Sequence, residues 1–231
     1  SAEIRNTFQQ GLWLSSLVAL CSWWIMRHIG GVMSLMSVEA SVIPLVESYL
    51  QITSWGMPSV CLYFVCRFLC EGTGNARPMM LIQFLVLPIN IFLSWILIFG
   101  KLGFPVLAVN GAALASTICL WLTAGLLLVY VATAGRYHHL KLFRDFSRPS
   151  LIEIGKLARL GLPVAGLLIL EAGFFNAIAL MMGSLGQTAL AAHNVVMNYV
   201  TLIFMIPVGL ANALMVRVGQ AMGESGVAEA R

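Results

Sequence analysis

Charged side chains are scarce in this sequence. Lysine, arginine, aspartate and glutamate make up 10% of its 231 residues, and hydrophobic residues make up 60%. A soluble globular domain carries about 25% charged residues, because its surface faces water. The shortage of charge therefore argues against a soluble domain and favours a chain that crosses a membrane several times.

Motifs of catalysis and metal binding are also missing. The sequence has no GxxxxGK[ST] phosphate loop and no nucleophile set beside a base, so we expect no enzymatic step, no cofactor and no ATP-driven reaction. The net charge of +4 lies in a few loops, without the basic patch of a protein that binds nucleic acid. The cysteines show no CxxC pair and no zinc spacing, so we expect them to pack among apolar residues. They are Cys21, Cys61, Cys66, Cys70 and Cys119.

Long apolar runs are what the sequence has in excess. A hydrocarbon core of about 30 Å requires about 20 helical residues. Six continuous runs of this length occur, without the alternation of a β-strand, so the sequence predicts an all-α polytopic membrane helix bundle. Pro58, Pro88 and Pro207 lie inside these runs, where each can kink a helix. The expected spans are residues 8–26, 49–66, 79–99, 107–133, 162–184 and 190–216.

The loop charges predict the direction of the chain. Eleven of the 13 Lys and Arg residues lie at one set of span ends, and only Arg27 and Lys101 lie at the other. Lysine and arginine concentrate in cytoplasmic loops. We therefore expect the first span to start in the cytoplasm and the last to return there.

A basic segment after the fourth span suggests a boundary. We expect residues 1–134 to hold four spans, residues 135–160 to form a cytoplasmic linker, and residues 161–231 to hold two more spans. Residues 150–161 place apolar side chains on one helical face and charges on the other, which predicts an amphipathic helix on the membrane surface. The alternative is that they form the first turns of the next span. Because the chain begins with serine and ends in a polar stretch, we expect it to be a piece of a longer protein.

One carboxylic acid interrupts the fifth run, "LLILEAGFFNAIAL". Glu171 lies nine residues into the span, about 13.5 Å deep at 1.5 Å per residue. An acid near the membrane midplane costs about 2.5–3.5 kcal/mol, unless it faces a wet cavity or carries a proton. No Lys or Arg lies at mid-depth in any span, so an ion pair within this chain is not expected. A site that exchanges a proton, a sodium ion or an organic cation is the favoured interpretation, and a structural hydrogen bond is the alternative.

Two polar stripes follow from helical phase. Residues at i, i+7 and i+11 of the third span, and at i, i+4 and i+7 of the sixth, share a helix face. Such stripes either line a polar cavity or join helices through hydrogen bonds worth about 0.6 kcal/mol each. The first stripe is Gln83, Asn90 and Ser94, and the second is Asn194, Asn198 and Thr201.

Three stretches give the chain a family resemblance. They are "FLCEGTGNARPMM" (68–80), "LPINIFLSWILIFGKLGFPVLAVNGAALAS" (87–116) and the run 160–224 that begins "LGLPVAGLLILEAGFF". In this order and spacing they resemble multidrug and toxic compound extrusion (MATE) transporters, most closely the NorM type. The resemblance implies twelve transmembrane helices in two pseudo-symmetric lobes, of which this chain would hold helices three to eight. The missing helices of the parent chain would then be its partners.

The resemblance also implies a function. Family members export small organic cations across the bacterial inner membrane in exchange for sodium ions or protons. Glu171 matches a seventh-helix glutamate of the NorM branch that takes part in cation binding, and it would be the sodium site if sodium is the coupling ion. Asn90 matches a fifth-helix asparagine of the DinF-type branch. That branch has an aspartate one turn later, where this chain has Ser94, which argues against a DinF-style proton site.

Two other functions remain open. A flippase for lipids or lipid-linked oligosaccharides predicts a large cavity with cationic side chains for pyrophosphate, and the absence of mid-span Lys or Arg speaks against it. A membrane structural subunit that transports nothing predicts that Glu171 is held in one hydrogen bond.

Overall fold

The computed structural model describes residues 2–28, 43–103, 105–138 and 148–224. Every regular element within these ranges is a helix, which confirms the predicted all-α class. The chain forms two compact units, Ser1–Ile154 and Gly155–Arg231, and each is described by itself.

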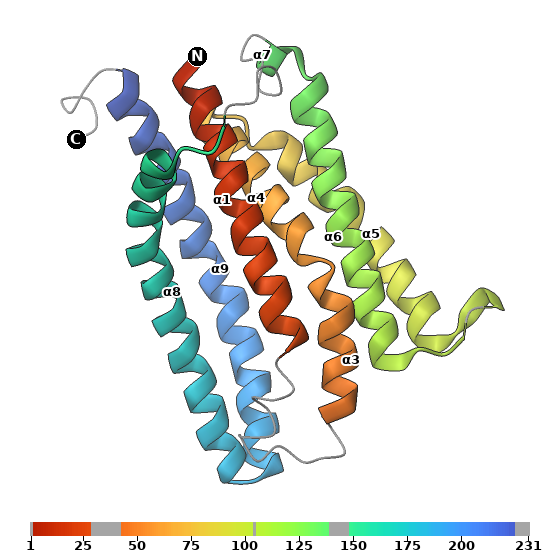
Figure 1. Ribbon diagram of the computed structural model, residues 1–231. Coiled ribbons are helices and arrows are strands. Elements are labelled where there is room, and N and C mark those ends of the chain that lie inside the picture. The colour runs from red at the N-terminus through yellow and green to blue at the C-terminus, as the bar shows by residue number, and fades with distance from the viewer. Residues whose placement is uncertain (1, 29–42, 104, 139–147, 225–231) are drawn as a thin grey trace. The chain divides into compact units, whose positions relative to one another are not determined.

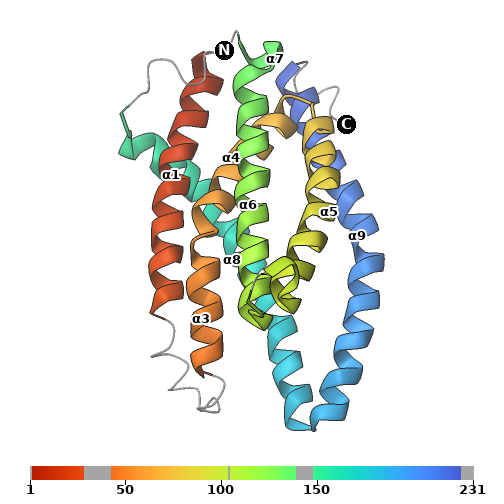
Figure 2. The same ribbon diagram turned by 90° about the vertical axis from the view of Figure 1, so that its right-hand side faces the viewer.

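The first unit is a bundle with one helix at its centre. Helix α6 packs against α3, α4 and α5, and α1 packs against α3 and α4 (Figures 1 and 2). Small residues let α6 approach its neighbours: a Cβ on Gly111 would lie 2.5 Å from the carbonyl oxygen of Leu97 on α5. The helices are α1 (Ala2–Arg27), α3 (Ile43–Ser54), α4 (Met57–Gly72), α5 (Arg77–Phe99), α6 (Ala108–Thr133) and the short α7 (Gly135–His138).

The second expected span is broken, although the sequence predicts a single helix there. Helices α3 and α4 meet at an angle of 43° across a short break. Pro58 lies in the first turn of α4, where its missing N–H is tolerated, so the bend lies before this proline and not at it. Pro88 and Pro207, in contrast, lie inside the continuous helices α5 and α9.

Most expected spans have the length and apolar composition that a membrane requires. Among the described helices, α5, α6, α8 (Leu151–Ser184) and α9 (Gln187–Glu224) qualify, and the bent pair α3 and α4 makes a fifth if it is one span. The first expected span is helical as α1 but does not qualify. Gln9 and Gln10 near its start lower its mean hydropathy.

The second unit is a hairpin of two long helices. Helices α8 and α9 are joined at Leu185 and Gly186, whose φ of 114° favours glycine, and they diverge from this turn (Figure 2). Helix α8 runs without interruption from Leu151, with Pro163 inside it and no break after Gly161. This continuity favours the alternative in which residues 150–161 form the first turns of the span, and the linker boundary stays a prediction.

The core of the first unit lies near the basic, predicted cytoplasmic ends of its helices. Thiols contribute to this core: Cys66, Cys70 and Cys119 are buried and unbridged, as expected, whereas Cys21 is exposed. Helix α8 buries none of its residues. The core cluster is Phe8, Cys66, Leu69, Cys70, Leu127, Val131 and Tyr137.

Candidate functional site

A pocket of about 490 Å³ lies between α4, α5 and α6. Apolar side chains from α5 and α6 form most of its wall, and neutral polar groups interrupt them. Among the described residues, no Lys, Arg, Asp or Glu lines it. Such a wall suits a mainly apolar molecule that also makes a few hydrogen bonds. The polar lining residues are Tyr63, Gln83, Asn90, Ser116 and Thr123.

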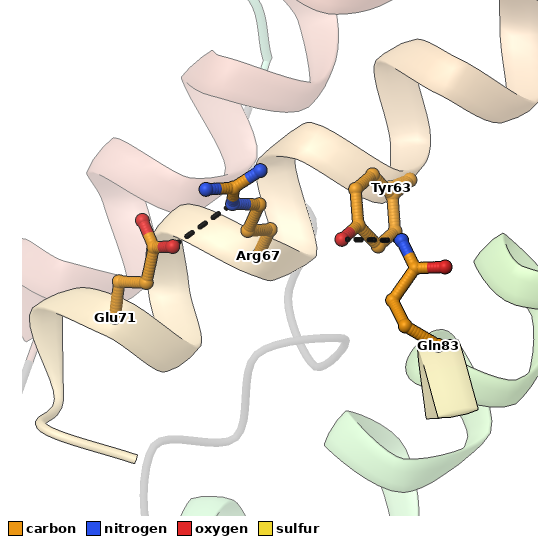
Figure 3. Close-up of polar contacts among 4 residues, drawn as sticks. All are labelled: Tyr63, Arg67, Glu71 and Gln83. Carbon is orange, nitrogen blue, oxygen red and sulfur yellow. Dashed lines mark hydrogen bonds and ion pairs between the residues drawn. The ribbon is translucent and has the colours of Figure 1, made fainter. Parts of the chain in front are cut away.

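A hydrogen bond joins two walls of this pocket. Gln83 Nε2 on α5 donates to the Tyr63 hydroxyl on α4 at 3.2 Å (Figure 3). Four and eight residues beyond Tyr63, on the same face of α4, Arg67 Nε donates to Glu71 Oε1 at 2.9 Å (Figure 3). The Arg67–Glu71 pair is not part of the pocket wall, so the charge of α4 stays outside the pocket.

The first predicted stripe coincides in part with this pocket. Gln83 and Asn90 both line it, whereas Ser94 on the next turn of α5 does not. The structure therefore brings two of the three side chains to one cavity, and their binding role stays a prediction.

The second-unit candidates line neither the pocket between α4, α5 and α6 nor the cavity of about 460 Å³ beside α1. Glu171 on α8, and Asn194 and Asn198 on α9, are exposed side chains without a hydrogen bond to the rest of the described chain. Asn176 Nδ2 donates to the carbonyl of Ala172 on its own helix, at 2.8 Å. No group of three His, Cys, Asp or Glu residues in the described ranges could hold a metal ion. A sodium site at Glu171 therefore stays a prediction.

A second cavity, of about 460 Å³, lies between α1 and the break that separates α3 from α4. Trp23 and Trp55 line it with ring centroids 6.1 Å apart. The Arg27 guanidinium lies 5.0 Å from the Trp23 ring and 6.0 Å from the Trp55 ring. These cation–π contacts join the predicted external end of α1 to the break between α3 and α4. The indole N–H of Trp121 donates to the Trp55 carbonyl at 2.9 Å and ties the break to α6.

Buried amides on α1 are the main feature that sequence reasoning missed. Gln9 and Gln10 are each 1% exposed. Gln10 hydrogen-bonds to the segment before α8, and Asn6 to the first turn of α8. The signal was present as three amides at i, i+3 and i+4 at the start of a span, a spacing that puts them on one face.

Two tyrosines form hydrogen bonds at the end of the bundle where α7 lies. The Tyr137 hydroxyl lies 3.2 Å from Thr73 Oγ1, and Asn75 Nδ2 donates to the Tyr130 hydroxyl at 2.9 Å. Burial raises the pKa of the Tyr137 phenol above its ordinary value, an effect that the hydrogen bond with Thr73 partly opposes. These contacts join α6 and α7 to the end of α4.

These features define a multi-pass helical membrane protein with a neutral-walled pocket in its first unit. A family model described as MatE matches residues 2–96 and 163–231, in both units. The chain therefore belongs to the MatE family.

Curated relatives support this assignment. The chain is 36% identical to the "Probable multidrug resistance protein NorM" of Idiomarina loihiensis over 96% of this chain and 48% of that protein. It is 34% identical to the "Multidrug resistance protein NorM" of Aliivibrio fischeri over 97% of this chain and 49% of that protein. The chain thus spans about half the length of the curated relatives it matches.

A solved structure shows the same fold. The crystal structure of the eukaryotic MATE transporter AtDTX14 matches with a TM-score of 0.81 over 96% of this chain and 49% of that one, at 21% identity. The likeness is to half of a transporter, in agreement with the sequence relatives.

Proposed function

We propose that this chain is part of a multidrug efflux antiporter of the bacterial inner membrane, which exports organic cations in exchange for sodium ions or protons. The pocket between α4, α5 and α6 is the observation that carries the proposal. Its volume, about 490 Å³, falls within the range of about 300–1,000 Å³ in which proteins bind drug-sized molecules. Membership of the MatE family and likeness to NorM proteins support the same function.

The residues of the two units have different roles in this proposal. Gln83 and Asn90 hydrogen-bond the substrate in the first unit, and Ser94 extends the polar stripe along α5. Glu171 binds the coupling ion and releases it when substrate takes its place. Asn194 and Asn198 line the route beside α9. Their exposure follows if the remaining helices of the parent chain, absent from this sequence, cover them.

The neutral pocket also weighs against a flippase. A pyrophosphate group carries several negative charges and requires cationic partners. In the part of the chain that the structure describes, no Lys or Arg lines the pocket. The pocket of the first unit is thus better suited to a mainly apolar molecule than to a pyrophosphate.

Glu171→Gln in the intact parent tests the role of the acid. Ethidium uptake into inverted membrane vesicles is measured under an imposed proton or sodium gradient. We expect the gradient that drives uptake to identify the coupling ion. The gradient-driven uptake rate of the variant should be at least tenfold lower than that of wild type, because a neutral amide cannot attract a cation by its charge.

The control is Glu47→Gln, an acid in the first unit near the predicted external end of α3, which should keep wild-type uptake. Normal driven uptake in Glu171→Gln would contradict the assigned role. No uptake by the parent under either gradient would contradict the antiporter itself.

A further inference from the structure

One side-chain amide binds the segment that leads into α8. Gln10 Nε2 donates to the carbonyl oxygen of Arg148 at 3.0 Å, and the backbone N–H of Ser150 donates to Gln10 Oε1 at 2.9 Å. The side chain therefore makes, on either side of Pro149, the two hydrogen bonds that an adjacent strand would make. All these residues belong to the first unit, which ends at Ile154.

A second contact holds the first turn of α8. Asn6, one turn before Gln10 on α1, donates through Nδ2 to Glu153 Oε2. The Ser150 carbonyl accepts from the N–H of Ile154 at 2.9 Å, so the helix begins at the residue that Gln10 binds. Two side chains of α1 thus fix both the peptide before α8 and its first turn. We call these contacts of Asn6 and Gln10 the α1 clamp.

Burial makes the α1 clamp expensive to open. Gln10 is 1% exposed, and breaking hydrogen bonds of a buried amide carries a desolvation penalty that is not recovered from water. Pro149 fixes its own φ and restricts Arg148, so the segment loses little freedom when it docks. Opening would break the hydrogen bonds of Gln10 to the Arg148 carbonyl and to the Ser150 N–H.

We propose that Gln10 is a positioning residue that keeps the start of α8 attached to the first unit throughout transport. Movement of the second unit then begins after Ile154, within α8 itself. Gly155, Gly161 and Pro163 lie in this part of the helix, and a Cβ on either glycine would meet nothing within 4 Å. Glycine lowers helix stability relative to alanine, and proline removes a helix hydrogen bond. This part of α8 is therefore the weaker one.

Hydrogen exchange in the full-length parent tests the α1 clamp without reference to transport. Gln10→Leu has a similar size but can neither donate nor accept. We expect peptides that cover residues 148–154 to exchange at least fivefold faster in this variant, and Gln10→Glu, which keeps the acceptor for Ser150, to be intermediate. Ser16→Ala removes another hydrogen bond of α1, from Ser16 Oγ to the Leu12 carbonyl at 2.8 Å, and should leave these peptides unchanged. Equal exchange in Gln10→Leu and wild type would overturn the proposal.

Crosslinking tests whether the α1 clamp stays closed during transport, and this arm rests on the proposed function. Asn6→Cys and Glu153→Cys are combined with Cys21→Ser, and a short bifunctional methanethiosulfonate reagent joins positions 6 and 153. We expect gradient-driven ethidium uptake to remain within twofold of the rate after reductant removes the link. Uptake that stops on crosslinking and returns on reduction would overturn the proposal, as would failure of the two positions to crosslink. If the parent transported under no condition, only the proposed function would be contradicted. The hydrogen-exchange experiment would then be the test of whether Gln10 holds the start of α8.

Discussion

At the scale of single residues, polar groups in this chain follow two patterns. In the first unit they find partners: Gln10 binds two peptide groups, and Gln83 binds Tyr63. In the second unit Glu171 and Asn198 are exposed on apolar helices. Polar groups inside a membrane require partners or water. The second pattern is what we expect if the proposed partners of these positions are water or other helices of a longer parent protein.

Tyr137 gives a pH-dependent prediction at this scale. Burial raises the pKa of its phenol, so the folded state holds the proton more tightly than the unfolded state does. The resulting stabilisation is complete below the unfolded pKa of about 10 and is lost as pH rises through the higher folded value. We expect the apparent unfolding midpoint of the detergent-solubilised parent to fall more steeply above pH 10 in wild type than in Tyr137→Phe. At pH 8 the variant should lose about 0.5–1.5 kcal/mol with the hydroxyl contact to Thr73.

The matched control is Tyr199→Phe, which removes a hydroxyl from a side chain that is 69% exposed. Its midpoint should follow wild type from pH 8 to pH 11. Identical pH profiles for wild type and Tyr137→Phe would show that the buried phenol does not contribute to the pH dependence.

At the scale of elements, the sequence predicts where helices lie better than where they break. The continuous apolar runs are predicted well because a membrane span requires about 20 apolar residues. The division at Trp55 and Gly56 was predicted only as a kink at Pro58, since the helix period continues on both sides. The sequence did not decide between a surface helix and the first turns of a span for residues 150–161, because both have the same amphipathic pattern. The contacts that α1 makes with this segment are between distant parts of the chain, which periodicity does not report.

The α5–α6 contact gives a prediction at the element scale. Gly111→Ala would place a methyl group 2.5 Å from the backbone oxygen and 2.6 Å from the carbonyl carbon of Leu97. The helices must then separate, so we expect a loss of about 1–3 kcal/mol, typical of overpacking, and a lower apparent unfolding midpoint for the solubilised parent. Substrate affinity should fall as well, because α5 and α6 form two walls of the pocket.

Gly125→Ala on the same helix is the control. A Cβ there meets nothing within 4 Å, and alanine favours a helix by about 1 kcal/mol over glycine. This variant should be as stable as wild type or slightly more so. If both alanine variants behaved alike, the close approach at Gly111 would not explain the packing of the two helices.

At the scale of the whole molecule, the class of protein was predictable and the site only in part. Low charge and six apolar runs predict a helical membrane bundle. Helical phase brings Gln83 and Asn90 to one face, and the structure places both on one pocket. Helical phase alone does not predict that Ser94 lies outside the pocket, because the extent of the pocket also depends on side chains of α4 and α6. The surroundings of Glu171 are equally beyond prediction from this chain, because the relatives are about twice as long.

The two units should differ in stability when the 231-residue chain is produced alone in a membrane. Helix α6 buries residues along its length, whereas α8 buries none. The protection of a backbone amide from hydrogen exchange increases with the free energy needed to open the structure around it, and packing supplies most of that free energy. We therefore expect amides of α6 to exchange at least tenfold more slowly than those of the α8 segment after Ile154. Supplying the rest of the parent as a second polypeptide should slow exchange in α8 and α9 and restore gradient-driven uptake. If α8 and α9 were as protected in the isolated chain as in the parent, their exposed faces would require no partner, and the ion site that we propose at Glu171 would have to be complete within this hairpin.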